Sequence, residues 1–105
     1  MSIRRTKIVA TLGPASNTAR SIGALVQAGI DVARINASHG TAEQRASLIT
    51  LVRQAALDAG RPVAILLDLQ GPRIRVGDLA APVRLTPGET VTFAPEEMAQ
   101  PGQLP

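Results

Sequence analysis

The sequence predicts an α/β protein with a parallel sheet, followed by a small antiparallel β unit. Up to Gly71, strand-like runs alternate with segments whose apolar residues recur at helical spacing. The third of these runs, Val63–Leu69, is apolar except at Asp68 and does not alternate, which is typical of a strand covered on both faces. Alternating strands and helices imply right-handed crossovers between parallel strands. Beyond Gly71, proline and glycine divide the chain into short runs.

The first strand is expected at Lys7–Leu12 and ends before Pro14, because proline lacks the donor that an interior strand needs. Ser16 or Asn17 is expected to cap the helix that follows, since both side chains accept hydrogen bonds from unpaired helix amides. This helix is expected to end near Gly29. Its apolar positions recur at helical spacing: Ile22, Leu25, Val26 and Ile30.

The second strand is expected at Val32–Asn36, and the polar turn Ser38–Gly40 leads from it to a second helix. Thr41 and Gln44 have the spacing of a capping box, so the helix is expected to begin there. It ends before Gly60, the residue type preferred at helix C-termini. Its apolar stripe has the helical period: Leu48, Ile49, Leu51, Val52, Ala55, Ala56 and Leu57.

The remaining segment has the pattern of short antiparallel strands. Val83–Leu85 and Thr90–Phe93 flank Pro87–Gly88, a dipeptide typical of a tight turn. We therefore expect two regions with different architectures, 1–76 and 77–105.

Composition and charge exclude several classes of function. The 105 residues are 45% hydrophobic and 18% charged, as in a globular domain, and the net charge is +3. Nucleic-acid footprints are clustered and often aromatic, whereas here the arginines are dispersed and Phe93 is the one aromatic residue, so no nucleic-acid partner is expected. The arginines are Arg4, Arg5, Arg20, Arg34, Arg45, Arg53, Arg61, Arg73, Arg75 and Arg84.

The sequence shows no sign of export or of a membrane anchor. Met1–Arg5 is followed by the apolar run Ile8–Ala10, which is too short for the hydrophobic region of a signal peptide. The longest apolar run, Val63–Leu67, falls far below the roughly 20 residues that span a bilayer. Cysteine is absent, which excludes a disulfide framework and thiolate metal ligands. We expect a cytoplasmic protein without a membrane partner.

Polar side chains follow the apolar strands, where parallel α/β folds bind ligands. Thr11–Ser16 holds a hydroxyl and a glycine before a helix, and a capped turn is favoured there over a ligand contact. Arg34 and Asn36 share one strand face because side chains alternate. Arg34 has no apparent local partner, and its planar guanidinium matches phosphate oxygens, so a phosphate is the natural counter-charge.

Oxygen-bearing side chains lie in and after the second and third strands. Asn36 and Ser38 suit a hard cation, and His39 supplies a donor at the start of a helix. Internal hydrogen bonds at a turn explain these residues equally well. Asp68 ends the third strand and is a cation ligand, a cap or an ion-pair partner of Arg73. Glycine-rich nucleotide-binding signatures are absent, so side chains would have to hold any nucleotide.

Three segments resemble the pyruvate kinase family in order and spacing: Thr6–Ser16, Val32–Gly40 and Leu67–Arg75. The resemblance implies the first three βα units of a (β/α)8 TIM barrel in 1–76 and the start of a small inserted β-barrel domain in 77–105. It also implies phosphoryl transfer between phosphoenolpyruvate and ADP, giving pyruvate and ATP in glycolysis, with Mg²⁺ or Mn²⁺ and often K⁺. The complete enzyme is expected to be a cytoplasmic homotetramer.

The resemblance further implies roles for individual residues. Arg34 would contact the transferring phosphate, and His39 and Arg75 the nucleotide phosphates. The groups that would line a monovalent-cation site belong to Asn36, Ser38, Asp68 and, through its carbonyl, Leu69. In the family, the lysine that handles the proton and the divalent-metal ligands lie in later strands, so this chain alone is expected to be inactive. The alternative is a short non-catalytic module that binds phosphate or a partner.

Two positions depart from the family pattern. Ala37 replaces a larger apolar residue, a change that affects packing more than ligation. Arg73 stands where K⁺-dependent members carry Glu and K⁺-independent members carry Lys, and Leu69–Gln70 also resembles the independent type. The resulting hypothesis is that the Arg73 guanidinium supplies the positive charge of K⁺, which weakens the case for a cation site.

Overall fold

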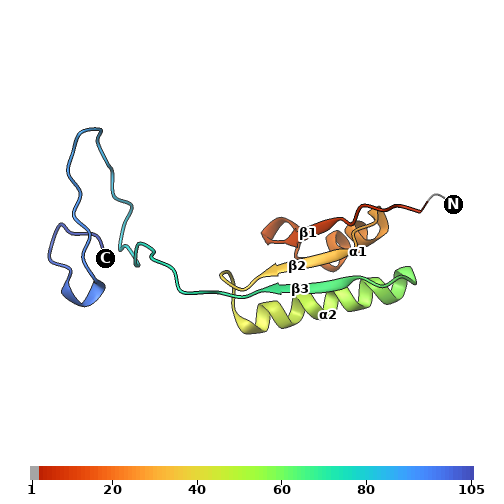
Figure 1. Cartoon of the computed structure of the whole chain (residues 1–105). Coiled ribbons are helices and arrows are strands. Elements are labelled where there is room, and N and C mark those ends of the chain that lie inside the picture. The colour runs from red at the N-terminus through yellow and green to blue at the C-terminus, as the bar shows by residue number, and fades with distance from the viewer. Residues whose placement is uncertain (1–2) are drawn as a thin grey trace. The chain divides into compact units, whose positions relative to one another are not determined.

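The computed structural model describes residues 3–105; Met1 and Ser2, which begin the segment considered as a signal peptide, lie outside the described residues. The chain divides into two compact units, one ending at Gly71 and the other starting at Pro72 (Figure 1). The two predicted domain ranges, which place the boundary slightly later, remain a prediction. In the described part of the chain, no helix has the length and apolar character needed to cross a membrane.

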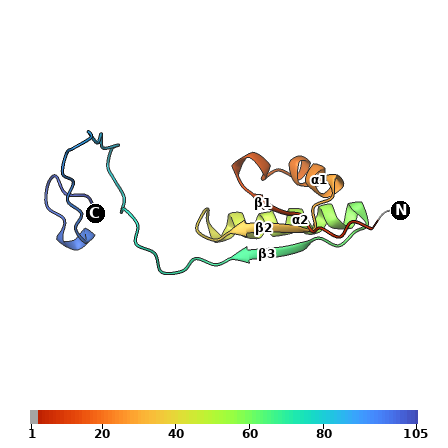
Figure 2. The ribbon, with the colours of Figure 1, turned by 45° about the horizontal axis from the view of Figure 1, so that its top comes forward.

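The first unit is a parallel sheet of three strands in the order β1-β2-β3, with helices between successive strands (Figure 1, Figure 2). β1 pairs in parallel with β2, and β2 with β3. The α/β class and the parallel sheet are therefore confirmed, and β2 has the predicted bounds. The elements are β1 (Val9–Leu12), the 3-10 turn η1 (Pro14–Ser16), α1 (Ala19–Ala28), β2 (Val32–Asn36), α2 (Ala42–Ala59) and β3 (Ala64–Asp68).

α1 begins later than the sequence predicts. The Thr18 side chain accepts a hydrogen bond from the Ser21 N–H at 3.1 Å, so Thr18 is the N-cap. The predicted cap at Ser16 or Asn17 is wrong, because the Ser16 hydroxyl is used one turn earlier, where it accepts the Gly13 N–H at 3.0 Å. The tight turn after β1 therefore takes this side chain and delays the helix.

α2 begins and ends as predicted. The Thr41 hydroxyl accepts the Gln44 N–H at 3.2 Å, and the Gln44 side chain accepts the Thr41 N–H at 2.9 Å, which completes the capping box. Both helices end at glycine: φ is 106° at Gly29 and 63° at Gly60, values in the left-handed region that favours this residue. The chain then returns directly to the next strand.

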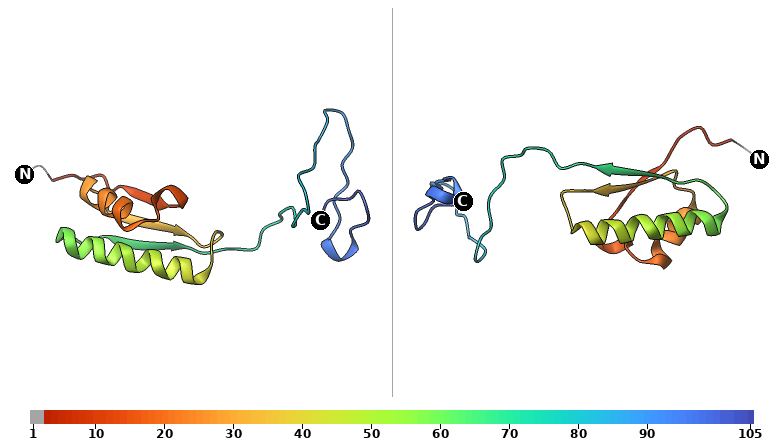
Figure 3. Two further views of the ribbon diagram at one scale, coloured as in Figure 1. Left: turned by 180° about the vertical axis from the view of Figure 1, so that it is seen from behind. Right: turned by 90° about the horizontal axis from the view of Figure 1, so that it is seen from below.

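Both helices cover the same face of the sheet, and the core lies between the two layers (Figure 3). Alternation along β2 turns Ala33 and Ile35, which are 0% and 2% exposed, toward the helices. It turns Arg34 and Asn36 to the opposite face, which no helix of the described first unit covers. The buried core residues are Leu12, Ile22, Val26, Ile30, Ala33, Ile35 and Val52.

β3 is more exposed than the sequence predicts. Leu66 and Leu67, which point to opposite faces, are 44% and 43% exposed. β3 lies at one edge of the sheet and has β2 as its only strand neighbour in the described structure. The expectation that this strand is covered on both faces is therefore wrong for the chain by itself, and an open apolar edge results.

An ionic cluster joins the segments that precede the three strands. Asp31 accepts hydrogen bonds from the Ile8 N–H at 2.8 Å and from Arg4 at 2.9 Å. Its other carboxylate oxygen lies 3.6 Å from an Arg61 nitrogen. The Ile8 hydrogen bond, helped by the charges of Arg4 and Arg61, lowers the pKa of Asp31 below its ordinary value. The cluster fastens the amino ends of the strands, opposite to Asn36 and Asp68.

The second unit contains the predicted turn. The Glu89 N–H donates to the Thr86 carbonyl at 3.1 Å across Pro87–Gly88. Gly88 has a φ of 86°, which explains why glycine follows proline here. The turn at this dipeptide is therefore confirmed.

The antiparallel strands predicted on either side of this turn do not form. Val83–Leu85 and Thr90–Phe93 join no strand ladder, and Phe93 instead makes a single parallel bridge with Leu104. A 3-10 turn, η2 (Glu96–Met98), follows. The prediction fails because two short strands are marginal without a third strand or a helix that covers their apolar side chains, and no residue of this unit is fully buried.

Candidate functional site

Arg34 is the centre of a polar cluster on the helix-free face of the sheet. Its Nε and Nη2 donate to Asp68 Oδ2 at 3.2 and 2.5 Å, and its Nη1 donates to Thr11 Oγ1 at 3.0 Å. The prediction that Arg34 lacks a local partner is therefore wrong. Strand register explains the contacts: Thr11 pairs with Arg34, and Asp68 pairs with Asn36, so these four residues share one face.

The guanidinium of Arg34 keeps donors for a ligand. A guanidinium has five N–H groups, and the contacts with Asp68 and Thr11 use three of them. The Arg34 and Asp68 side chains are 31% and 48% exposed, so water screens this ion pair and the pair adds little stability. The contacts therefore orient Arg34 more than they stabilise the fold.

Thr11 is the member of this cluster for which the sequence predicts no contact with Arg34. The favoured interpretation of Thr11–Ser16 is a capped turn, and Ser16 does bond with Gly13 in that way. Thr11 itself precedes the turn and faces Arg34 from β1. Alternation places Thr11 on the face opposite to the buried Leu12, as it places Arg34 opposite to the buried Ile35, but the register that pairs the two residues comes from the structure alone.

The turn after β2 contains the internal hydrogen bonds that the sequence leaves open as an alternative. The Asn36 side-chain oxygen accepts the Ser38 N–H at 3.0 Å, and the Asn36 carbonyl accepts the His39 N–H at 3.2 Å. The Asp68 carbonyl accepts the Ala37 N–H at 2.9 Å and ties this turn to β3. Asn36 and Asp68 are also register partners, so their oxygens lie on one face at the ends of adjacent strands.

The loop between β2 and α2 has a restrained path. Arg45 donates to the carbonyls of His39 and Gly40 at 3.1 and 2.8 Å. Gly40 has a φ of 70°, and a Cβ at this position would lie 2.8 Å from the Gln44 side-chain oxygen. A larger residue would therefore disturb the helix cap. The exposed His39 is held at the start of α2, where the helix dipole favours anions.

The segment after β3 contributes less defined geometry. Asp68 pairs with Arg34, a partner that none of the three interpretations of this carboxylate named. Leu69 is 73% exposed. Arg73 and Arg75 are exposed and belong to the second unit. Their roles, like that of the Leu69 carbonyl, therefore remain predictions.

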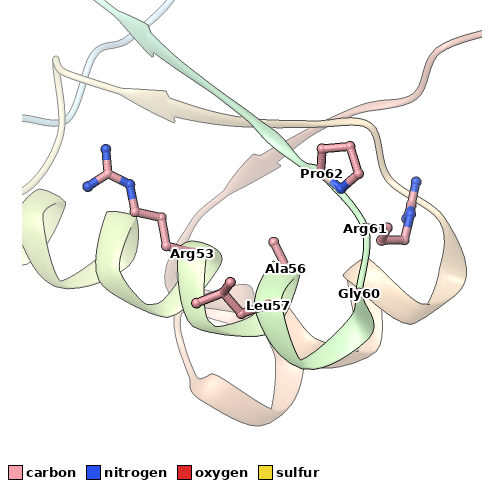
Figure 4. A pocket seen from close by; sticks show the side chains of 6 residues that line it. All are labelled: Arg53, Ala56, Leu57, Gly60, Arg61 and Pro62. Carbon is pink, nitrogen blue, oxygen red and sulfur yellow. The ribbon is translucent and has the colours of Figure 1, made fainter.

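The hollow that the first unit contains lies apart from the Arg34 cluster. Among residues 3–105, no group of three His, Cys, Asp or Glu side chains is arranged to hold a metal ion. A shallow hollow lies where α2 ends and β3 approaches, at the amino end of β3 and thus opposite to Asp68 (Figure 4). Its lining residues are Arg53, Ala56, Leu57, Gly60, Arg61 and Pro62.

Comparison with known sequences places the chain in a family. The family profile described as "Pyruvate kinase, barrel domain" matches residues 3–103. The chain belongs to the pyruvate kinase family. A pyruvate kinase from Chlamydia muridarum is 41% identical over 96 residues, which cover 91% of this chain and 20% of that protein. A pyruvate kinase from Mycobacterium intracellulare is 52% identical over 89 residues, which cover 84% of this chain and 19% of that protein.

A solved structure agrees with the sequence comparisons. The crystal structure of a pyruvate kinase from Cryptosporidium parvum matches with a TM-score of 0.67 and 40% identity, over 72% of this chain and 16% of that chain. The chain therefore spans about one fifth of the length of the pyruvate kinases it matches. The recognition of the family from three sequence segments is confirmed.

Proposed function

We propose that this chain contributes the opening part of the catalytic barrel of a pyruvate kinase, which transfers a phosphoryl group between phosphoenolpyruvate and ADP and gives pyruvate and ATP in glycolysis. One observation carries the proposal beyond family membership: Arg34 presents its guanidinium at the carboxyl end of a parallel sheet, on the face that no helix of the described first unit covers. Ligands bind at this end in parallel α/β folds. The enzyme is proposed to be a cytoplasmic homotetramer.

In this proposal the three strands are the first of a (β/α)8 barrel. The helices would then lie on the outside, and Thr11, Arg34, Asn36 and Asp68 would line the inside at the active end. The exposed apolar residues of β3 would meet the next strand. Residues 77–105 would begin the inserted β domain, where further strands would supply the packing that the isolated turn lacks.

Phosphoryl transfer requires positioning and charge neutralisation more than a nucleophile from the protein. The N–H groups that Arg34 keeps free of Thr11 and Asp68 would bind the transferring phosphate, because a guanidinium matches two phosphate oxygens at once. His39 and Arg75 would bind the nucleotide phosphates. Mg²⁺ or Mn²⁺ would neutralise phosphate charge, with ligands outside this chain.

The proposed monovalent-cation site uses oxygens of Asn36, Ser38, Asp68 and Leu69. The donor set suits K⁺, since it combines neutral oxygens with one carboxylate. Both hydrogen bonds from Arg34 go to Oδ2 of Asp68, which leaves Oδ1 for a cation. Arg73 is the competing source of positive charge, and we propose that it reduces the requirement for K⁺.

A chimeric enzyme tests the proposed function. In this chimera, the aligned 89-residue segment of the Mycobacterium intracellulare pyruvate kinase is replaced by the corresponding residues of this chain. We expect the chimera to form pyruvate and ATP from phosphoenolpyruvate and ADP in a coupled assay, with the host enzyme as control. A chimera that folds by circular dichroism but has no turnover would contradict the proposal and favour a non-catalytic module.

Asp31→Asn is expected to lower the stability of the chimera and to leave kcat unchanged, because Asp31 lies at the amino ends of the strands. The folded-state pKa of Asp31 lies below the ordinary value of 3.8, so its contribution is present above that value and is lost as the pH falls through the lowered pKa. The thermal midpoint should fall by a few degrees at pH 7. The difference from the parent chimera should vanish in strong acid. Equal midpoints at pH 7 would refute the stabilising role.

A further inference from the structure

We infer that Thr11 is a positioning residue, which holds the Arg34 guanidinium in the orientation that receives the transferring phosphate. The inference rests on the proposed function and deepens it. The carrying observation is the hydrogen bond from Arg34 Nη1 to Thr11 Oγ1 at 3.0 Å, across the β1–β2 register pair.

The guanidinium is held from both neighbouring strands. Asp68, on β3, accepts from Nε and Nη2, which form one edge of the planar group. Thr11, on β1, accepts from Nη1 at the other side. A guanidinium fixed along one edge alone keeps freedom to swing about that edge. Hydrogen bonds to β1 and β3, the strands on either side of β2, fix both the plane of the guanidinium and the direction in which its free N–H groups point.

The two anchors leave a matched pair of donors. Nη1 carries two N–H groups and gives one to Thr11; Nη2 carries two and gives one to Asp68. One N–H therefore remains on each terminal nitrogen of Arg34. Donors on these two nitrogens, which share Cζ, can bind two oxygens of one phosphate.

Packing does not explain a hydroxyl at this position. Thr11 is exposed on the helix-free face, whereas its neighbours Ala10 and Leu12 pack on the core side. Valine has the same shape as threonine and is at least as favourable in a strand. The distinguishing property of Thr11 is thus its oxygen, and that oxygen contacts Arg34.

Two substitutions in the chimeric enzyme separate positioning from packing. Thr11→Val keeps the shape and removes the acceptor; Thr11→Ser keeps the acceptor and removes a methyl group. We expect Thr11→Val to lower kcat/KM for phosphoenolpyruvate about tenfold, the usual effect of losing a hydrogen bond to a charged group. The KM for ADP should not change. Thr11→Ser should retain most of the activity, because its hydroxyl still accepts from Arg34.

The reverse order of the two variants, with Thr11→Ser more impaired than Thr11→Val, would overturn the inference, as would two variants equal to the parent. The activity of the unsubstituted chimera tests the proposed function independently of the two Thr11 variants. Should the chimera be inactive, side-chain NMR of Arg34 gives the second measurement. We expect slow rotation about Cζ–Nη1 in the parent and in Thr11→Ser, and fast rotation in Thr11→Val. Identical rotation in all three proteins would refute the positioning role.

Discussion

Arg34→Lys in the chimeric enzyme is expected to lower kcat about a hundredfold, the scale of losing a preorganised donor at developing charge. Arg34 serves three partners: Asp68, Thr11 and, in the proposed reaction, the phosphate. A lysine ammonium carries the same charge, but its donors diverge from one atom and cannot form the planar fork. It would satisfy Asp68 and lose the paired contact with phosphate. Steady-state assays with saturating ADP measure the effect.

Arg20→Lys is the matched control for this substitution. Arg20 is exposed in the first turn of α1, a helix that lies on the face of the sheet opposite to Arg34. The control should keep the kcat of the parent chimera. If Arg34→Lys also stays within a few-fold of the parent, the proposed phosphate contact is wrong.

The fold of the first unit follows from local patterns. The alternating pattern of β2 and the capping box of Thr41 and Gln44 predict their elements with the observed bounds, because alternation and capping are decided by neighbours in sequence. The cap of α1 fails for a local reason too: the hydroxyl of Ser16 bonds with Gly13 instead. Two acceptors near one turn compete, and the sequence does not rank them.

The site was harder to predict than the fold. Alternation places Arg34 and Asn36 on one face, but it does not say which residues of β1 and β3 lie opposite them. That depends on the register across two crossovers, which brings Thr11 and Asp68 to Arg34. A partner at a sequence distance of 23 or 34 residues leaves no local signal. The sequence therefore suggested an unpaired arginine where the structure has an anchored one.

In the second unit, the local turn was predicted correctly and the strands on either side of it were not. The turn at Pro87–Gly88 forms because its residues prefer that backbone, whereas the flanking strands need partners that lie outside the turn. A pattern of residues with high β-propensity indicates that a segment can form a strand where other side chains pack against it. The pattern alone does not provide the neighbouring strands or helix that such packing requires.

Arg73→Glu is expected to make the chimeric enzyme dependent on K⁺. With a large inert cation in place of K⁺, the parent chimera should keep most of its turnover, and Arg73→Glu should lose it about tenfold or more, since one fixed positive charge becomes negative. Arg73→Lys, which keeps the charge, should behave like the parent. Assays of all three enzymes with and without K⁺ measure the difference. A near-total loss of turnover in the parent chimera without K⁺ would sink the hypothesis.

Arg73→Glu and Arg34→Lys should also differ in whether added K⁺ restores their turnover. K⁺ should restore turnover to Arg73→Glu, because the proposed role of Arg73 is to supply charge, and an ion bound by oxygens of Asn36 and Asp68 supplies the same charge. K⁺ should not restore Arg34→Lys, because that variant already carries the charge and lacks the planar pair of donors. Rescue of Arg34→Lys by K⁺ would mean that the variant does not fail for want of the planar pair of donors, and the orientation set by Thr11 would then have no catalytic consequence.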